Sequence, residues 1–341
     1  MNNLLQDREN LITRHRLSHR QIDILFVENK SKEFINISIL SLEFIKHFIE
    51  LIDILDQHSI PYISFKGPLL SQQIYGDPTV RFSHDIDILV DKNSMDEINK
   101  VLLNAGYSNM YNTMWPDNKN QIKMLMDSIH HLGYRHNQHG LIVEIHWTLS
   151  TTLPVKSRVL QKVIDGNRRG EIICGRKIMT FSLEFNLLYL IIHGSKHGWQ
   201  RLKWLVDIKD YPYDKINEQK FEELINLFHA QRIVSQAYII LRHYFNYDQP
   251  LLFKTKVPDR ILKSVYSFID NPINEHQGIA DNISFLLYKL LLFKNPYYKF
   301  SIFMEMMTSS HDAFKIKSSY KIVYFIYRPY SYIKRKVFHA K

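Results

Sequence analysis

Short stretches in the first half of the chain are rich in β-branched and apolar residues, whereas apolar residues recur at helical spacing through most of the second half. Alternation or continuous apolar character predicts strands within four stretches: 59–65, 81–90, 130–136 and 141–147. Turn residues at 137–140 indicate that the last two strands form a hairpin. Apolar spacing, a proline in a first turn and a Ser-x-x-Glu capping pattern predict helices over 37–55, 69–75 and 94–106.

The order of these elements predicts the fold class. Helix, strand, helix, strand, helix and hairpin follow one another up to Trp147, which is typical of a mixed α/β sheet with flanking helices. Residues 151–181 form a connection with a short hairpin around Gly175, and the chain beyond Ser182 is mainly helical. We therefore predict an α/β (α+β) chain in three parts: an N-terminal arm or helix (1–35), a sheet domain (36–155) and a mainly helical domain (156–341).

Two aspartates, Asp85 and Asp87, are one residue apart in an apolar stretch. Alternation points both carboxylates to the same face of a strand. Two anions on one sheet face repel each other unless a cation lies between them, and a divalent ion with oxygen ligands is the usual partner. The structural alternative is that they pair with Arg81 or His84, or lie on an exposed edge.

Glu144 supplies a third carboxylate. In the stretch 141–147, alternation places Glu144 and His146 on one face and Val143, Ile145 and Trp147 on the other. If this strand belongs to the same sheet, Glu144 can complete a metal site, and otherwise it is an ordinary exposed strand residue.

The turn before the helix at 69–75 has the features of a phosphate site. A strand runs into Lys66, Gly67 and Pro68, and a helix follows. Backbone N–H groups and the helix dipole at such an N-terminus attract anions, glycine permits close approach, and Lys66 adds a positive charge. The Lys-Gly pair alone is a weak signal, but here it precedes two carboxylates of metal-binding type.

Together these residues carry a resemblance to a known family. Lys66-Gly67, Tyr-Gly-Asp at 75–77, Arg-x-x-x-Asp-x-Asp-x-Leu-Val at 81–90 and Glu-Ile-His-Trp at 144–147 resemble the bacterial uncharacterised nucleotidyltransferases of the DNA polymerase β-like superfamily, over roughly residues 40 to 210. The resemblance implies a nucleotidyltransferase-fold sheet in which Gly67 opens the triphosphate-binding helix. It also implies that Asp85, Asp87 and Glu144 bind metal. Pro68 departs from the usual pattern because it has neither an N–H nor a hydroxyl to offer a phosphate, so triphosphate binding depends more on Lys66 and on residues outside the motif.

Composition agrees with a globular protein that binds a polyanion. The chain has 341 residues, is 45% hydrophobic and carries a formal net charge of +10. A basic balance suits a nucleotide or RNA, but also an acidic protein or a membrane surface. The single Cys174 excludes an internal disulfide and a zinc–thiolate cluster. The charged N-terminus and the lack of a long apolar run favour a cytoplasmic protein without a transmembrane segment.

Two further features of the helical half are candidates for ligand contacts. His193 and His197 lie four residues apart, and between them Lys196 is a candidate contact for the triphosphate. The pair lacks the glutamate of a zinc-protease motif, so local hydrogen bonding is the main alternative. The stretch 315–341 has eight Lys or Arg, several tyrosines and no acidic residue, which fits contact with RNA or a membrane surface, or simple packing of an aromatic helix face.

We therefore predict a nucleotidyltransferase that depends on Mg²⁺ or Mn²⁺ and transfers a nucleoside monophosphate from an NTP to an acceptor hydroxyl. Asp85, Asp87 and Glu144 are the predicted metal ligands and catalytic residues, with Glu144 also a candidate base. Lys66, Gly67, Arg81 and Lys196 are the predicted nucleotide contacts. The sequence does not identify the acceptor: a small molecule, a peptide, a protein or RNA all fit. Two alternatives stay open, namely a toxin-like tRNA nucleotidyltransferase resembling the AbiEii group and a binding scaffold without turnover.

Overall fold

The structure is a computed structural model that describes residues 5, 7–26, 34–111, 115–116, 119–247, 255–271, 279–307, 312, 316, 318 and 320–338. The chain divides into two compact units, each built from three segments. The first contains Met1–Lys46, Phe65–Ser83 and Pro154–Asn295, and the second contains His47–Ser64, His84–Leu153 and Pro296–Lys341. The helix α3 (Phe34–Gln57) crosses the division after Lys46.

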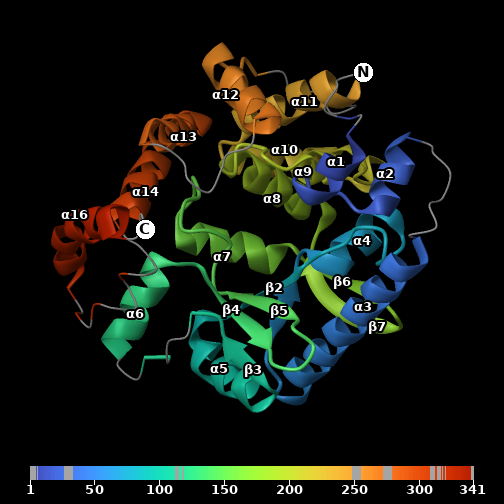
Figure 1. Cartoon of the computed structure of the whole chain (residues 1–341), viewed down its shortest axis with the longest axis horizontal. Helices are drawn as coiled ribbons and strands as arrows, with labels where there is room; N and C mark the ends of the chain where they lie inside the picture. Colours follow the sequence, from blue (N-terminus) through green and yellow to red (C-terminus); the bar gives the residue numbers. More distant parts are fainter. Residues whose placement is uncertain are drawn as a thin grey trace. The chain divides into compact units, whose positions relative to one another are not determined.

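A five-stranded sheet forms the centre of the second unit (Figure 1). Its strands are β1 (Tyr62–Ser64), β2 (Asp85–Val90), β3 (Tyr107–Asn109), β4 (His131–His136) and β5 (Ile142–His146). They lie in the order β1-β2-β5-β4-β3, with β2 and β5 parallel and the other neighbours antiparallel. The predicted mixed α/β sheet and the β4–β5 hairpin are thus confirmed.

One face of this sheet is the core of the second unit. Its fully buried side chains come from alternate positions of β2, β4 and β5: Ile86, Ile88, Leu132, Tyr134, Val143 and Ile145. The Tyr134 hydroxyl donates a hydrogen bond of 3.0 Å to Asn99 of α5 (Met95–Asn104), so that helix covers this face. Because side chains alternate along a strand, the intervening positions of β2 and β5 point to the opposite face, where the predicted carboxylates lie.

Further helices of the second unit are α6 (Lys119–Ser128), α14 (Pro296–Met307) and α16 (Lys321–Phe338). The helix predicted from Ser94 begins at Met95 as expected, but the Ser94 side chain makes no capping hydrogen bond. A short 3-10 turn precedes the helix instead, and Asp91 caps that turn by accepting from Asn93 N at 2.7 Å. Of the basic stretch 315–341, the structure describes 316, 318 and 320–338, and Lys315 lies outside the described residues.

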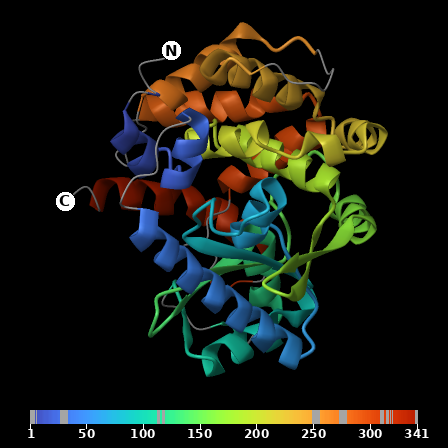
Figure 2. The same ribbon diagram turned by 90° about the vertical axis from the view of Figure 1, so that its right-hand side faces the viewer.

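The first unit is mainly helical. Its elements are α1 (Arg8–Thr13), α2 (His19–Phe26), α4 (Gly67–Tyr75), α7 (Ser157–Gly166), β6 (Arg168–Ile173), β7 (Arg176–Phe181), α8 (Leu183–Lys196), α9 (Leu202–Lys209), α10 (Glu218–Leu227), α11 (Gln231–Phe245), α12 (Asp259–Asp270) and α13 (Ile279–Leu292). The strands β6 and β7 form the predicted hairpin around Gly175, and α8 packs against α9, α10, α11 and α13 (Figure 2). A helical C-terminal region is therefore confirmed. No helix among the described residues is long and apolar enough to cross a membrane.

Candidate active site

The carboxylates predicted to bind metal lie on two adjacent parallel strands. Asp87 of β2 is in register with Glu144 of β5, so the two side chains stand next to each other on the sheet face opposite the core. The Asp87 side chain is only 3% exposed, whereas that of Glu144 is 29% exposed. The site thus has a buried carboxylate and a second one that reaches solvent.

His146 links these two carboxylates. Its Nε2 lies 3.1 Å from Oδ1 of Asp87 and 3.3 Å from Oε2 of Glu144. An imidazole placed between two carboxylates offers its N–H to them, and in the protonated form it offsets part of their charge. The alternation of β5 places His146 on this face because it is two residues after Glu144.

The charges around Glu144 favour its ionised form. Burial by itself raises the pKa of this carboxyl, and the negative charge of Asp87 acts in the same direction. The hydrogen bond with His146 and the charges of His131 and His146 act against them, and the net pKa of Glu144 lies below its ordinary value. Glu144 is therefore a carboxylate at neutral pH, able to hold a cation or to accept a proton.

Asp85 lies on the same sheet face, two residues before Asp87 along β2. Its partner on β5 is Ile142, whereas the partner of Asp87 is Glu144. Asp87, Glu144 and His146 form one of the close groups of possible metal ligands among the described residues, with ligand atoms within 4.8 Å of one another. Asp85 is outside that group, and its half-exposed side chain at the start of β2 can contribute a ligand to an ion at the edge of the group.

The donor set fits a divalent metal ion. Two carboxylate oxygens are the ligands of Mg²⁺ and Mn²⁺, and they supply the negative charge that a divalent ion needs. The imidazole nitrogen of His146 suits Mn²⁺ and other transition ions better than Mg²⁺, which prefers oxygen. On these donors Asp87 and Glu144 would hold the ion, and His146 would bind it or orient Glu144.

The predicted phosphate turn is in the first unit and has the expected backbone. Lys66 is the N-cap of α4, and its side chain makes no capping hydrogen bond there. Gly67 has a φ of 61°, a left-handed conformation that disfavours residues with a Cβ, and Pro68 follows in the first turn. The Lys66 ammonium lies 5.6 Å from the ring centre of Tyr189 on α8. The turn thus presents a helix N-terminus and a positive charge together.

Lys66 and Lys196 belong to one basic cluster around His197. Desolvation by the surrounding protein lowers the pKa of His197, although part of the side chain is exposed, and nearby positive charges lower it further. In decreasing order of effect, these charges belong to Lys196, Lys66, Lys289 and Arg201. Four cations near one neutral imidazole form a site of the kind that attracts a polyanion.

Aromatic rings form the second part of this cluster. The rings of His193 and His197 are 4.6 Å apart, and each lies 5.4 Å from the Trp204 ring. The Arg201 guanidinium lies 5.6 Å from the centre of the same indole. The two histidines therefore pack against an aromatic neighbour, His193 with its ring edge-on to the Trp204 indole and His197 with its ring tilted.

The loop between α8 and α9 holds these side chains in place. Gly198 and Trp199 both have a positive φ, of 63° and 56°. Trp199 is fully buried, its Nε1 donates to Gln236 at 3.2 Å, and its ring packs so closely on Gly194 that a Cβ there would approach it to 2.3 Å. This packing fixes the path of the chain from Lys196 to Arg201.

Arg81, one of the predicted nucleotide contacts, forms an internal ion pair. Its side chain is 5% exposed, and its Nε donates to Oδ1 of the fully buried Asp207 at 2.7 Å. The neighbouring Lys203 donates to the carbonyl of Phe82 at 2.5 Å. Arg81 therefore anchors the segment before β2 to α9, and this placement favours a structural role over contact with a phosphate.

The comparisons with known proteins agree with the motifs. The family model of uncharacterised nucleotidyltransferases matches residues 33–246, which is more than half of the chain. The chain belongs to this nucleotidyltransferase family. The resemblance inferred from the Lys-Gly, Asp-x-Asp and Glu-Ile-His-Trp motifs is thereby confirmed, over a longer segment than these motifs span. A search among curated proteins gives no match.

Residues missed by sequence reasoning also belong to the site. His146 was predicted to share a face with Glu144, but no role follows from alternation alone. His131 on β4 is in register with His146, and its Nε2 lies 3.7 Å from Oε1 of Glu144. The predicted hairpin contained a signal for His131. Once the register of the two strands is known, the short turn places His131 opposite His146.

Proposed function

We propose that this chain transfers a nucleoside monophosphate from an NTP to an acceptor hydroxyl and releases pyrophosphate, at the face of the sheet that carries Asp87 and Glu144. The observation that carries the proposal is the in-register carboxylate pair, held together by His146 and attached to a parallel strand pair. Family membership supports the reaction class. The acceptor hydroxyl and the divalent metal are parts of this proposal.

Each side chain has a definite part in this reaction. A divalent ion bound here would draw electron density from the α-phosphate and lower the pKa of the acceptor hydroxyl. Asp87 and Glu144, with Asp85 at the edge, supply the negative charge that holds Mg²⁺ or Mn²⁺. Glu144 is ionised and reaches solvent, so it is also the candidate base that takes the hydroxyl proton as the new oxygen–phosphorus bond forms and the bond to pyrophosphate breaks.

A transfer assay tests the proposal. The full chain is incubated with each NTP, radiolabelled at the α-phosphate, and Mg²⁺ or Mn²⁺ in the presence of a bacterial lysate, and protein, RNA and small-molecule fractions are then separated. We expect label in one fraction above the level that the lysate gives alone, and loss of this label on addition of EDTA. Label in tRNA would favour the toxin-like alternative. Tight NTP binding with no labelled fraction for any NTP would contradict transfer and favour a binding scaffold.

Lys66→Ala tests the predicted nucleotide contacts separately from catalysis. If the ammonium binds a phosphate at the α4 N-terminus, its removal should weaken NTP binding by about 1.5–3 kcal/mol, the range for a hydrogen bond to a charged group. That corresponds to roughly 10- to 150-fold in Kd. Calorimetry with a non-hydrolysable NTP measures the change, and Lys162→Ala, an exposed lysine on α7, is the matched control. Equal affinities of the two variants would remove Lys66 from the nucleotide site.

A further inference from the structure

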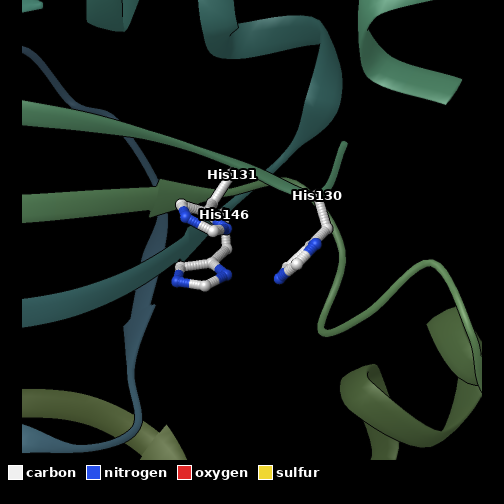
Figure 3. Close-up of side chains that lie close together, drawn as sticks. All are labelled: His130, His131 and His146. Carbon is white, nitrogen blue, oxygen red and sulfur yellow. The ribbon is translucent and has the colours of Figure 1, made fainter. Parts of the chain in front are cut away.

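Three imidazoles gather at the end of the β4–β5 hairpin opposite its turn, at the border of the carboxylate site (Figure 3). They belong to His130, His131 and His146, and one nitrogen of each lies within 4.8 Å of the others. His130 and His131 are not members of the close group formed by Asp87, Glu144 and His146. The nucleotidyl-transfer proposal assigns them no role.

Backbone pairing fixes this arrangement. His131 and His146 are directly opposite each other in the antiparallel ladder. The ladder continues by one more hydrogen bond, in which Trp147 N donates to the His130 carbonyl at 3.1 Å. Trp147 is in turn held by its Nε1, which donates to the carbonyl of Met126 at 3.0 Å. The Cα atoms of the three histidines are therefore set by hydrogen bonds within the hairpin and to α6.

The ring geometry suits convergence on one ion. The ring centres of His131 and His146 are 4.8 Å apart and their planes are inclined by 30°. The planes of His130 and His131 are inclined by 71°, and those of His130 and His146 by 44°. An ion bound to an imidazole lies near the plane of that ring, and inclined planes intersect. At metal–nitrogen distances of about 2.0–2.1 Å, two nitrogens on one ion are at most about 4 Å apart, so binding would draw these three nitrogens, which lie within 4.8 Å of one another, onto the ion.

We propose that His130, His131 and His146 bind a first-row transition ion of the Zn²⁺ type. Three neutral imidazoles form a common donor set for such an ion, while Mg²⁺ prefers oxygen ligands. His146 and Glu144, whose Oε1 is 3.7 Å from Nε2 of His131, also belong to the carboxylate group, so this ion and the ion of the proposed reaction would compete for them. The His131 side chain is 25% exposed and that of His146 is 4% exposed, so an ion enters from solvent on the His131 side.

A second group of possible ligands provides a comparison within the same unit. His47 and Glu50 on α3 and His139 in the hairpin turn also have ligand atoms within 4.8 Å of one another. The rings of His47 and His139, however, are stacked 3.7 Å apart with only 9° between their planes. Two parallel planes at that separation share no point where one ion can bind both rings. These side chains would have to rearrange before binding, which makes His139 the appropriate control.

Titration with Co²⁺ tests the proposal in the full chain. Co²⁺ replaces Zn²⁺ in such sites, and its visible absorption bands report ligand number and nitrogen coordination. We expect the metal-free protein to bind Co²⁺ with these bands and Zn²⁺ to abolish them. His130→Ala and His131→Ala should each weaken Co²⁺ binding by about 100-fold or more, because each removes a direct ligand. Removing a residue that only hydrogen-bonds a metal ligand typically weakens metal binding by about 10- to 100-fold. His139→Ala should retain the wild-type spectrum and affinity.

The experiment contains no nucleotide, so its result is independent of whether the chain transfers one. The proposal is wrong if wild-type protein shows no nitrogen-coordinated Co²⁺, if His130→Ala binds Co²⁺ like the wild type, or if the bands are lost in His139→Ala and kept in His130→Ala. His130→Asn and His131→Asn serve as second variants, because they keep polar side chains at these half-exposed positions. Circular dichroism verifies that every variant is folded before the titration.

Discussion

Asp87→Asn is expected to leave the chain folded and to reduce nucleotidyl transfer by about 10³-fold or more. The substitution keeps the size and shape of the side chain but replaces a carboxylate by a neutral amide. A neutral group cannot balance the charge of a divalent ion, whose stabilisation of developing charge is worth several kcal/mol in such reactions. The effect should be large because Asp87 is the buried member of the pair and water cannot take its place.

Two measurements check this result. Calorimetry compares Mn²⁺·NTP binding by wild type and variant, and the transfer assay compares their rates. Asp91→Asn is the matched control, since it makes the same chemical change one residue after β2 at an exposed position, where asparagine also caps the following turn. Unchanged metal affinity and rate in Asp87→Asn would contradict the metal hypothesis, and an equal loss in Asp91→Asn would indicate a general effect of charge.

The carboxylate face could be predicted because it depends on local pattern. Alternation alone places Asp85 with Asp87, and Glu144 with His146, on common faces. The parallel pairing of β2 with β5, which makes Asp87 the neighbour of Glu144, joins segments far apart in the chain. No local signal fixes that register, and the family resemblance implied only that Glu144 completes the site formed by Asp85 and Asp87.

Two elements of the structure were missed. The three-residue edge strand β3 is too short to show alternation. The helix α7 lies within a stretch predicted to be a connection with a short hairpin, although its buried residues Leu160, Val163 and Ile164 do recur at helical spacing. The predicted capping box at Ser94 was wrong because Asp91, three residues earlier, caps a 3-10 turn that leads into the helix. The strand β3 is set by its pairing with β4, whereas the Asp91 cap is a local feature of the sequence.

Arg81 illustrates the same limit for site residues. A charged residue four positions before an Asp-x-Asp motif fits either a phosphate contact or an internal ion pair, because both need a guanidinium with a fixed partner. Asp207 lies more than a hundred residues later in the chain, and in sequence it is only one acidic residue in a helix. The tertiary contact with Asp207 favours the internal ion pair. The pair therefore yields a prediction about stability.

Arg81→Met should destabilise the first unit by about 3–5 kcal/mol, the usual cost of leaving a buried charge without its partner. Asp207 is fully buried and Arg81 is 5% exposed, so water cannot replace the missing guanidinium. A loss of that size lowers the melting temperature by roughly 6–20 °C for a region of 150–250 residues. Urea unfolding followed by circular dichroism measures it, with Arg20→Met as the control, because Arg20 forms a more exposed ion pair with Asp77 in the same unit.

The double variant Arg81→Met/Asp207→Leu separates an ion pair from simple packing. If the cost of the single variant comes from the uncompensated Asp207 carboxylate, replacing both partners by apolar side chains of similar size should restore most of the lost stability. If Arg81 matters only through the volume of its side chain, the two losses should add. A structural role also requires that the double variant bind NTP as tightly as the wild type once it is folded. Weaker NTP binding in a fully folded double variant would return Arg81 to the nucleotide site.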